Sequence, residues 1–104
     1  HNMHVERKRT ITVDQIVEHA CEYFQIKQED VYGKSRKANI VLVRQLSMYL
    51  AQHHTQLTAS RIGNLVGGRN HATVIHSVRT IENRLKSDKD FQKKVTELEG
   101  KLKA

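Results

Sequence analysis

The sequence has no proline, no tryptophan and a single cysteine among its 104 residues. One cysteine cannot form an internal disulfide or a cysteine metal cluster, so Cys21 is expected to be a small buried apolar side chain of a protein in a reducing cytoplasm. The chain also lacks any run of about 18 apolar residues, so no transmembrane segment is expected. A hydrophobic content of 38% and a charged content of 28% are ordinary for one small helical domain.

Acidic residues are absent from a long internal stretch. No Asp or Glu occurs between Val31 and Ile81, a stretch of 51 residues that carries seven lysines and arginines. Outside it, 11 basic residues balance 11 acidic ones, so the whole net charge of +7 arises here. A long region of one sign favours a polyanionic partner, although a solvated basic surface without a partner is the alternative.

Signals for catalysis are also missing. The five glycines form no phosphate-binding GxxxxGK[ST] motif, no acid pair lies in an apolar setting, and Cys21 has no activating partner. His53 and His54 are adjacent, whereas a helical metal pair needs spacing i and i+4. We therefore expect no enzymatic activity, no metal and no cofactor in this chain.

Helical periodicity accounts for nearly all of the apolar residues. Residues 1–9, HNMHVERKR, are typical of a tag remnant and connector, so the domain is expected to span residues 10–104. Within it the pattern predicts an all-α fold of about six helices. The expected helices start at Thr12 or Asp14, cover Gln28–Tyr32 and about Asn39–His54, follow Thr58, follow Asn70 to about Leu85, and follow Ser87 or Asp88.

Residues 58–85 have the pattern of a helix-turn-helix. Thr58 can cap the first helix, whose residues Ile62, Leu65 and Val66 are expected to share one buried face. Gly67-Gly68 allows a sharp reversal, and Asn70 can cap the second helix. Val74, Val78, Ile81 and Leu85 form the apolar stripe of that helix, which leaves its first turn free to enter a major groove.

The segment GGRNHATVIHSV resembles the signature of the C-terminal DNA-binding domain of the bacterial DnaA replication initiator family, usually GGR-Asp-His-Thr-Thr-Val. The upstream segment KSRKANIVLVRQLSMYLA resembles the basic loop and following helix of that family, and the resemblance covers roughly residues 10–100. It implies base contacts by the exposed loop in the minor groove, at Arg36, and by the second helix in the major groove. The base-contacting positions are Arg36, Arg69, Asn70, His71, Ala72 and Thr73. The expected DNA-backbone contacts are Lys34, Lys37, Arg44, Gln45, Thr55, Ser60, His76 and Arg79.

Some positions depart from the family pattern. Asn70 replaces Asp, and it either alters the contact with one base or acts only as the helix cap. Ala72 replaces Thr and keeps a methyl group for a thymine contact. Ala38 stands in a segment where further arginines are usual, and Gln52 replaces a commonly basic residue, so some phosphate contacts are expected to be lost.

The resemblance implies a monomeric, cytoplasmic, nucleoid-associated domain that binds double-stranded DNA at the DnaA boxes of a replication origin. ATP is expected only in the family's ATPase domain, which this chain lacks. Acidic phospholipids and replication regulatory proteins are possible further partners. The alternatives are a fragment of a helix-turn-helix transcription repressor, and a basic module that binds acidic phospholipid or a regulatory protein.

Overall fold

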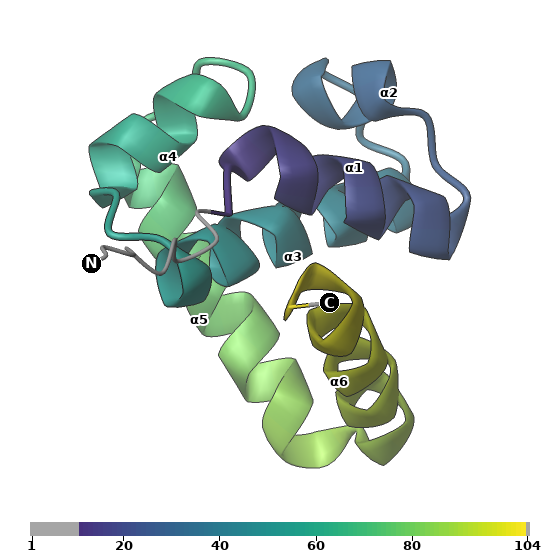
Figure 1. Cartoon of the computed structure of the whole chain (residues 1–104). Coiled ribbons are helices and arrows are strands. Elements are labelled where there is room, and N and C mark those ends of the chain that lie inside the picture. The colour runs from purple at the N-terminus through teal and green to yellow at the C-terminus, as the bar shows by residue number, and fades with distance from the viewer. Residues whose placement is uncertain (1–10, 104) are drawn as a thin grey trace, which may run out of the picture.

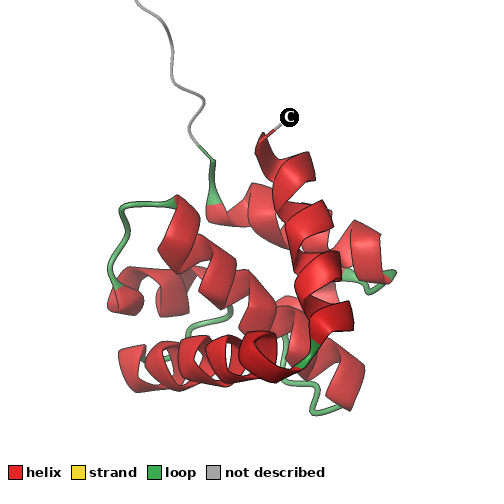
Figure 2. Ribbon diagram, turned by 90° about the horizontal axis from the view of Figure 1, so that it is seen from below, coloured by secondary structure: helices red, strands yellow, loops and turns green. Residues whose placement is uncertain are grey.

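The computed structural model describes residues 11–103, so the expected tag remnant and connector at residues 1–9 lie outside the described residues. The described part is helical throughout, without a strand, as Figure 2 shows. Its elements are α1 (Val13–Phe24), α2 (Gln28–Tyr32), α3 (Ala38–His54), α4 (Ala59–Leu65), α5 (His71–Ser87) and α6 (Lys89–Lys103). The predicted all-α class and the predicted order of six helices are confirmed.

Helix α3 lies at the centre and packs against α1, α2, α4 and α5 (Figure 1). Its side chains Val43, Leu46 and Leu50 are fully buried. Full burial of each such side chain contributes about 1.5–3 kcal/mol relative to exposure. Ile16 of α1 and Ile81 of α5 reach the same core, so the long helices share one apolar interior.

Capping side chains fix the starts of α1, α4 and α6, and the structure selects Thr12 over Asp14 and Asp88 over Ser87. Thr12 accepts a hydrogen bond from the backbone N–H of Gln15, whose side chain accepts in return from the Thr12 backbone, which completes a capping box. Thr58 caps α4 by accepting from Arg61, and Asp88 accepts from the backbone N–H of Phe91 at the start of α6. These contacts satisfy backbone donors that would otherwise lack partners.

Helix α6 folds back along the lower half of α5 and also reaches α1 (Figure 1). Phe91, Val95, Leu98 and Leu102 are buried, so the predicted apolar face is the packing face. Glu99 on the same helix lies 2.8 Å from His54 at the end of α3. Helix α6 therefore closes the core at the end of the molecule farthest from the first turn of α5.

One expected core residue is placed differently. Leu65 is 36% exposed, whereas Ile62 and Val66 are fully buried, so the prediction that all three share one buried face is wrong for Leu65. Helix α4 ends at Leu65, and the chain turns at Val66, which faces the core in its place.

Candidate nucleic-acid interface

The turn between α4 and α5 brings the two helices into close contact. Gly67 and Gly68 have φ of 78° and 73°, the left-handed region that glycine occupies without strain. The Arg69 backbone N–H then donates to the Gly63 carbonyl at 2.8 Å. A Cβ added to Gly63 would lie 2.1 Å from the Arg69 carbonyl oxygen, so only glycine fits there. The helix-turn-helix predicted from the sequence is confirmed in its backbone geometry.

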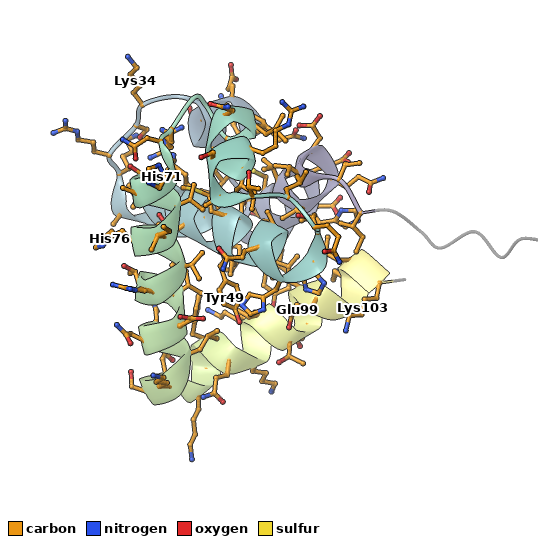
Figure 3. The ribbon with its side chains drawn as sticks, turned by 90° about the vertical axis from the view of Figure 1, so that its left-hand side faces the viewer. Lys34, Tyr49, His71, His76, Glu99 and Lys103 are labelled. Carbon is orange, nitrogen blue, oxygen red and sulfur yellow. The ribbon has the colours of Figure 1, made fainter. Side chains whose placement is uncertain are left out.

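Helix α5 begins with a polar, exposed first turn. The Asn70 side-chain oxygen accepts from the backbone N–H of Thr73 at 2.9 Å, which confirms Asn70 as the cap. His71, Ala72 and Thr73 are exposed, whereas Val74 is fully buried. In Figure 3, His71 and His76 lie along the same outer edge of α5. The free N–H groups and the helix dipole make this end attractive to phosphate.

The basic loop of residues 34–37 leads from α2 into α3. Lys34, Arg36 and Lys37 are exposed, and Ser35 is half-buried. In Figure 3, Lys34 projects from the molecule at the same end as His71. An exposed loop with three cations beside an exposed helix start can contact two neighbouring stretches of a polyanion.

Arg44 is the one predicted DNA-backbone residue that is buried, at 7% exposure. Its Nε donates to Val31 O, its Nη1 to Ser35 O, and its Nη2 to both Asp30 O and Gly33 O, at 2.9 to 3.1 Å. Burial and the nearby charge of Arg69 lower the pKa of Arg44 from its usual value. Four of its five N–H donors are thus occupied inside the protein.

Arg69, a predicted base-contacting residue, also points inward. Its Nη1 donates to Val66 O at 2.7 Å, and its Nη2 donates to Gly33 O, the same carbonyl that Arg44 contacts. Its side chain is half-buried, and burial lowers its pKa. The structure therefore brings Arg44 and Arg69 together at the base of the loop, an arrangement that sequence reasoning missed.

The other predicted residues fall into two groups by exposure. Gln45 and Thr55 are half-buried, and the Thr55 hydroxyl donates to the Ala51 carbonyl at 2.6 Å. Ser60, His76 and Arg79 are exposed on α4 and α5. Sequence reasoning also passed over Ile75, a large apolar side chain that is 42% exposed on α5. All of the individual DNA contacts stay predictions.

The described part of the chain offers neither a cluster of metal ligands nor a membrane-spanning helix. Residues 11–103 hold no group of three or more His, Cys, Asp or Glu side chains arranged to bind a metal ion. None of the described helices combines the length and the apolar character that a bilayer span requires.

The start of α5 is exposed after the glycine turn, lies next to an exposed basic loop, and belongs to a stretch free of acidic residues. Together these features define a helix-turn-helix DNA-binding domain. Comparison with known proteins gives the family. Residues 13–81 match the family model described as the bacterial dnaA protein helix-turn-helix. The chain belongs to this bacterial DnaA helix-turn-helix family.

Curated relatives agree along nearly the whole chain. The chromosomal replication initiator protein DnaA of Bacteroides thetaiotaomicron is 40% identical over 101 residues, which cover 97% of this chain and 21% of that protein. Its namesake in Limosilactobacillus reuteri is 37% identical over 98% of the chain and 23% of the relative. The Chlorobaculum tepidum protein is 37% identical over 90% and 19%. The chain spans about a fifth of the length of these relatives.

Proposed function

We propose that this chain recognises DnaA boxes in double-stranded DNA of a bacterial replication origin and so contributes to the initiation of chromosome replication. The observation that supports this most is the exposed first turn of α5 beside the exposed loop of residues 34–37, in a region without acidic residues. The relatives named chromosomal replication initiator supply the biological context.

Two DNA grooves are contacted in this proposal. The first turn of α5, with His71, Ala72 and Thr73, enters the major groove, where each base pair presents a distinct pattern of donors and acceptors. Arg36 of the loop enters the adjacent minor groove, where a narrow groove concentrates negative potential. Exposed residues such as Ser60, His76 and Arg79 hold phosphates and fix the register.

The domain acts as a monomer on an asymmetric site, in the cytoplasm and on the nucleoid, and requires neither ATP nor another cofactor for binding DNA. Fluorescence anisotropy tests this with a labelled duplex carrying a DnaA box against a scrambled duplex at two salt concentrations. Preference for the box that survives at the higher salt is the expected result. Equal and salt-sensitive affinity for both duplexes would contradict sequence-specific recognition.

Two further outcomes separate the alternatives. A transcription repressor fragment would prefer a palindrome and bind it as a dimer, which analytical ultracentrifugation of the complex detects. A lipid-binding module would bind vesicles containing phosphatidylglycerol while ignoring DNA sequence. Co-sedimentation with these vesicles also shows whether acidic phospholipid is an additional partner of a chain that does prefer the box. Pull-down with purified replication regulatory proteins tests whether they are further partners.

A further inference from the structure

Two arginines meet at a single carbonyl group beneath the basic loop. The Gly33 carbonyl accepts from Nη2 of Arg44 and from Nη2 of Arg69. Arg44 comes from the middle of α3, and Arg69 comes from the turn before α5. Gly33 directly precedes Lys34, the first cation of the loop. The base of the loop is thus joined to α3 by Arg44 and to the helix-turn-helix by Arg69, both of which are positively charged.

The remaining donors of Arg44 connect the end of α2 to the loop. The carbonyls of Asp30 and Val31 belong to the last turn of α2, where backbone acceptors lack partners and the helix dipole favours a cation. The Ser35 carbonyl lies within the loop, immediately before Arg36. Arg44 therefore fixes the backbone on both sides of Lys34.

Arg69 completes the link on the other side. Its Nη1 donates to Val66 O at the end of α4, while its backbone N–H donates to Gly63 O. A Cβ added to Gly67 would lie 2.1 Å from Arg69 Nη1 and 2.3 Å from the Tyr32 carbonyl oxygen. Gly67 is thus packed directly against Arg69 and the end of α2, without room for a larger residue.

Backbone carbonyls, rather than carboxylates, balance these two guanidinium groups. No salt bridge to either arginine is found among residues 11–103, and the surrounding stretch from Val31 to Ile81 has no acidic residue. Holding two like charges together is unfavourable unless each is well hydrogen-bonded. The planar guanidinium group, with five donors, can serve several carbonyls at once, which a lysine cannot.

We propose that Arg44 and Arg69 are positioning residues for DNA recognition, which fix the loop carrying Arg36 relative to the first turn of α5. This inference rests on the proposed function. With the loop held in place, the minor-groove and major-groove contacts reach one DNA site together without an ordering cost on binding. It assigns both residues to the inside of the protein, in place of the phosphate and base contacts that the family resemblance implies for them.

A double-mutant cycle tests this. Arg44→Lys, Arg36→Ala and the combination are titrated with a box duplex and a scrambled duplex at three salt concentrations. We expect Arg44→Lys to weaken binding to the box about tenfold, with an unchanged salt slope and less than about threefold loss on the scrambled duplex. In the Arg36→Ala background, Arg44→Lys should cost less than about twofold, because the side chain it positions is gone.

Matched variants make the outcome unambiguous. Combined with His71→Ala, Arg44→Lys should keep its full tenfold effect, since His71 belongs to α5 rather than to the loop. Arg84→Lys, the same exchange at an exposed arginine near the end of α5, should leave both affinities unchanged. Circular dichroism melting confirms folding of each variant. If Arg44→Lys does not fold, Arg69→Lys is tested in the same cycle, because this half-buried side chain makes fewer contacts.

The possible failures are distinguishable. A wild-type chain that does not prefer the box would overturn both the proposed function and this inference. If the wild-type chain prefers the box but the losses caused by Arg44→Lys and Arg36→Ala multiply in full, only the inference is overturned. The same holds if Arg44→Lys weakens binding to both duplexes by the same factor, which is the signature of a residue that contacts phosphate rather than one that positions the loop.

Discussion

His71 is the first residue of α5, and its side chain is exposed at the start of the helix. We expect His71→Ala to weaken binding to the box by about 1–3 kcal/mol and to affect random DNA much less, because a lost base contact removes discrimination. Parallel anisotropy titrations with both duplexes measure this. Equal losses on the two duplexes would show that His71 contacts only the DNA backbone.

Asn70 uses one side-chain atom to cap α5 and has another available for DNA. Its oxygen accepts from Thr73, which leaves its amide group as a free donor. Asn70→Asp should keep the cap and unfold at nearly the same urea concentration, whereas Asn70→Ala should lose about 1 kcal/mol of stability.

The same pair of variants separates capping from base recognition. We expect Asn70→Asp to shift the preferred base at one position towards cytosine, because a carboxylate only accepts and cytosine N4 only donates. A selection from randomised duplexes measures the preference of each protein. Identical selected sites for the wild type and Asn70→Asp would restrict Asn70 to its capping role.

The cap of α5 could be predicted from the sequence, whereas the partners of Arg44 could not. The cap at Asn70 follows from residue type and position, since short polar side chains satisfy the first free N–H groups of a helix. Arg44 donates to the carbonyl groups of Asp30, Val31 and Gly33 at the end of α2, and to that of Ser35. Every residue has a backbone carbonyl, so the sequence does not show which of them a side chain contacts. Helical spacing gave one overlooked signal, because Arg44 shares a face with buried Ile40, Ser47 and Ala51.

At the scale of elements, the two glycines between α4 and α5 serve different purposes. Both have positive φ, but a Cβ at Gly68 would meet nothing within 4 Å, whereas one at Gly67 would meet Arg69 and Tyr32. Gly68→Ala should therefore cost only about 1 kcal/mol from backbone strain. Gly67→Ala should cost clearly more, because the Tyr32 backbone must also shift. Urea unfolding followed by circular dichroism compares the two, and equal losses would contradict the close packing.

Helix α6 packs on the core without taking part in the proposed DNA surface. Leu98 is fully buried, and α6 contacts α1 and α5. We expect Leu98→Ala to destabilise the fold by about 2–5 kcal/mol while leaving the ratio of box to scrambled affinity unchanged below the melting temperature. Urea unfolding and anisotropy measure the two quantities separately. A changed ratio would mean that α6 influences the recognition surface.

The elements were predictable because their determinants are local. The caps at Thr58 and Asn70 and the apolar stripe of α5 follow from spacing and residue type alone. For α1 and α6 the sequence left two candidates each, and the structure selects Thr12 and Asp88. Leu65 was misplaced because α4 is only seven residues long, too short for periodicity to define a face once the chain leaves the helix. The contact between the loop and the turn depends on residues far apart in sequence, which periodicity cannot relate.

On the scale of the whole molecule, the seven basic residues of the acid-free stretch divide into two groups. Arg44 and Arg69 point inward, and the remaining side chains are exposed: Lys34, Arg36, Lys37, Arg61 and Arg79. Acidic residues lie elsewhere, with Glu18, Glu22 and Glu29 lining a groove between α1 and α2. A count of charges in the sequence therefore overstates the number of cations that can reach phosphates.

This division limits how much the acid-free stretch can contribute to the salt dependence of binding. Each neutralised phosphate contributes about 0.9 to the slope of log K against log salt, so five exposed cations permit a magnitude of at most about 4.5, whereas seven would permit about 6. Anisotropy titrations of the box duplex over a range of salt concentrations at one fixed pH give the slope. We expect a value at or below the lower figure, and Arg79→Ala should reduce it by about one. A magnitude near 6 would contradict this division, because cations beyond the five exposed ones, with Arg44 and Arg69 as candidates, would then contact phosphate in the complex.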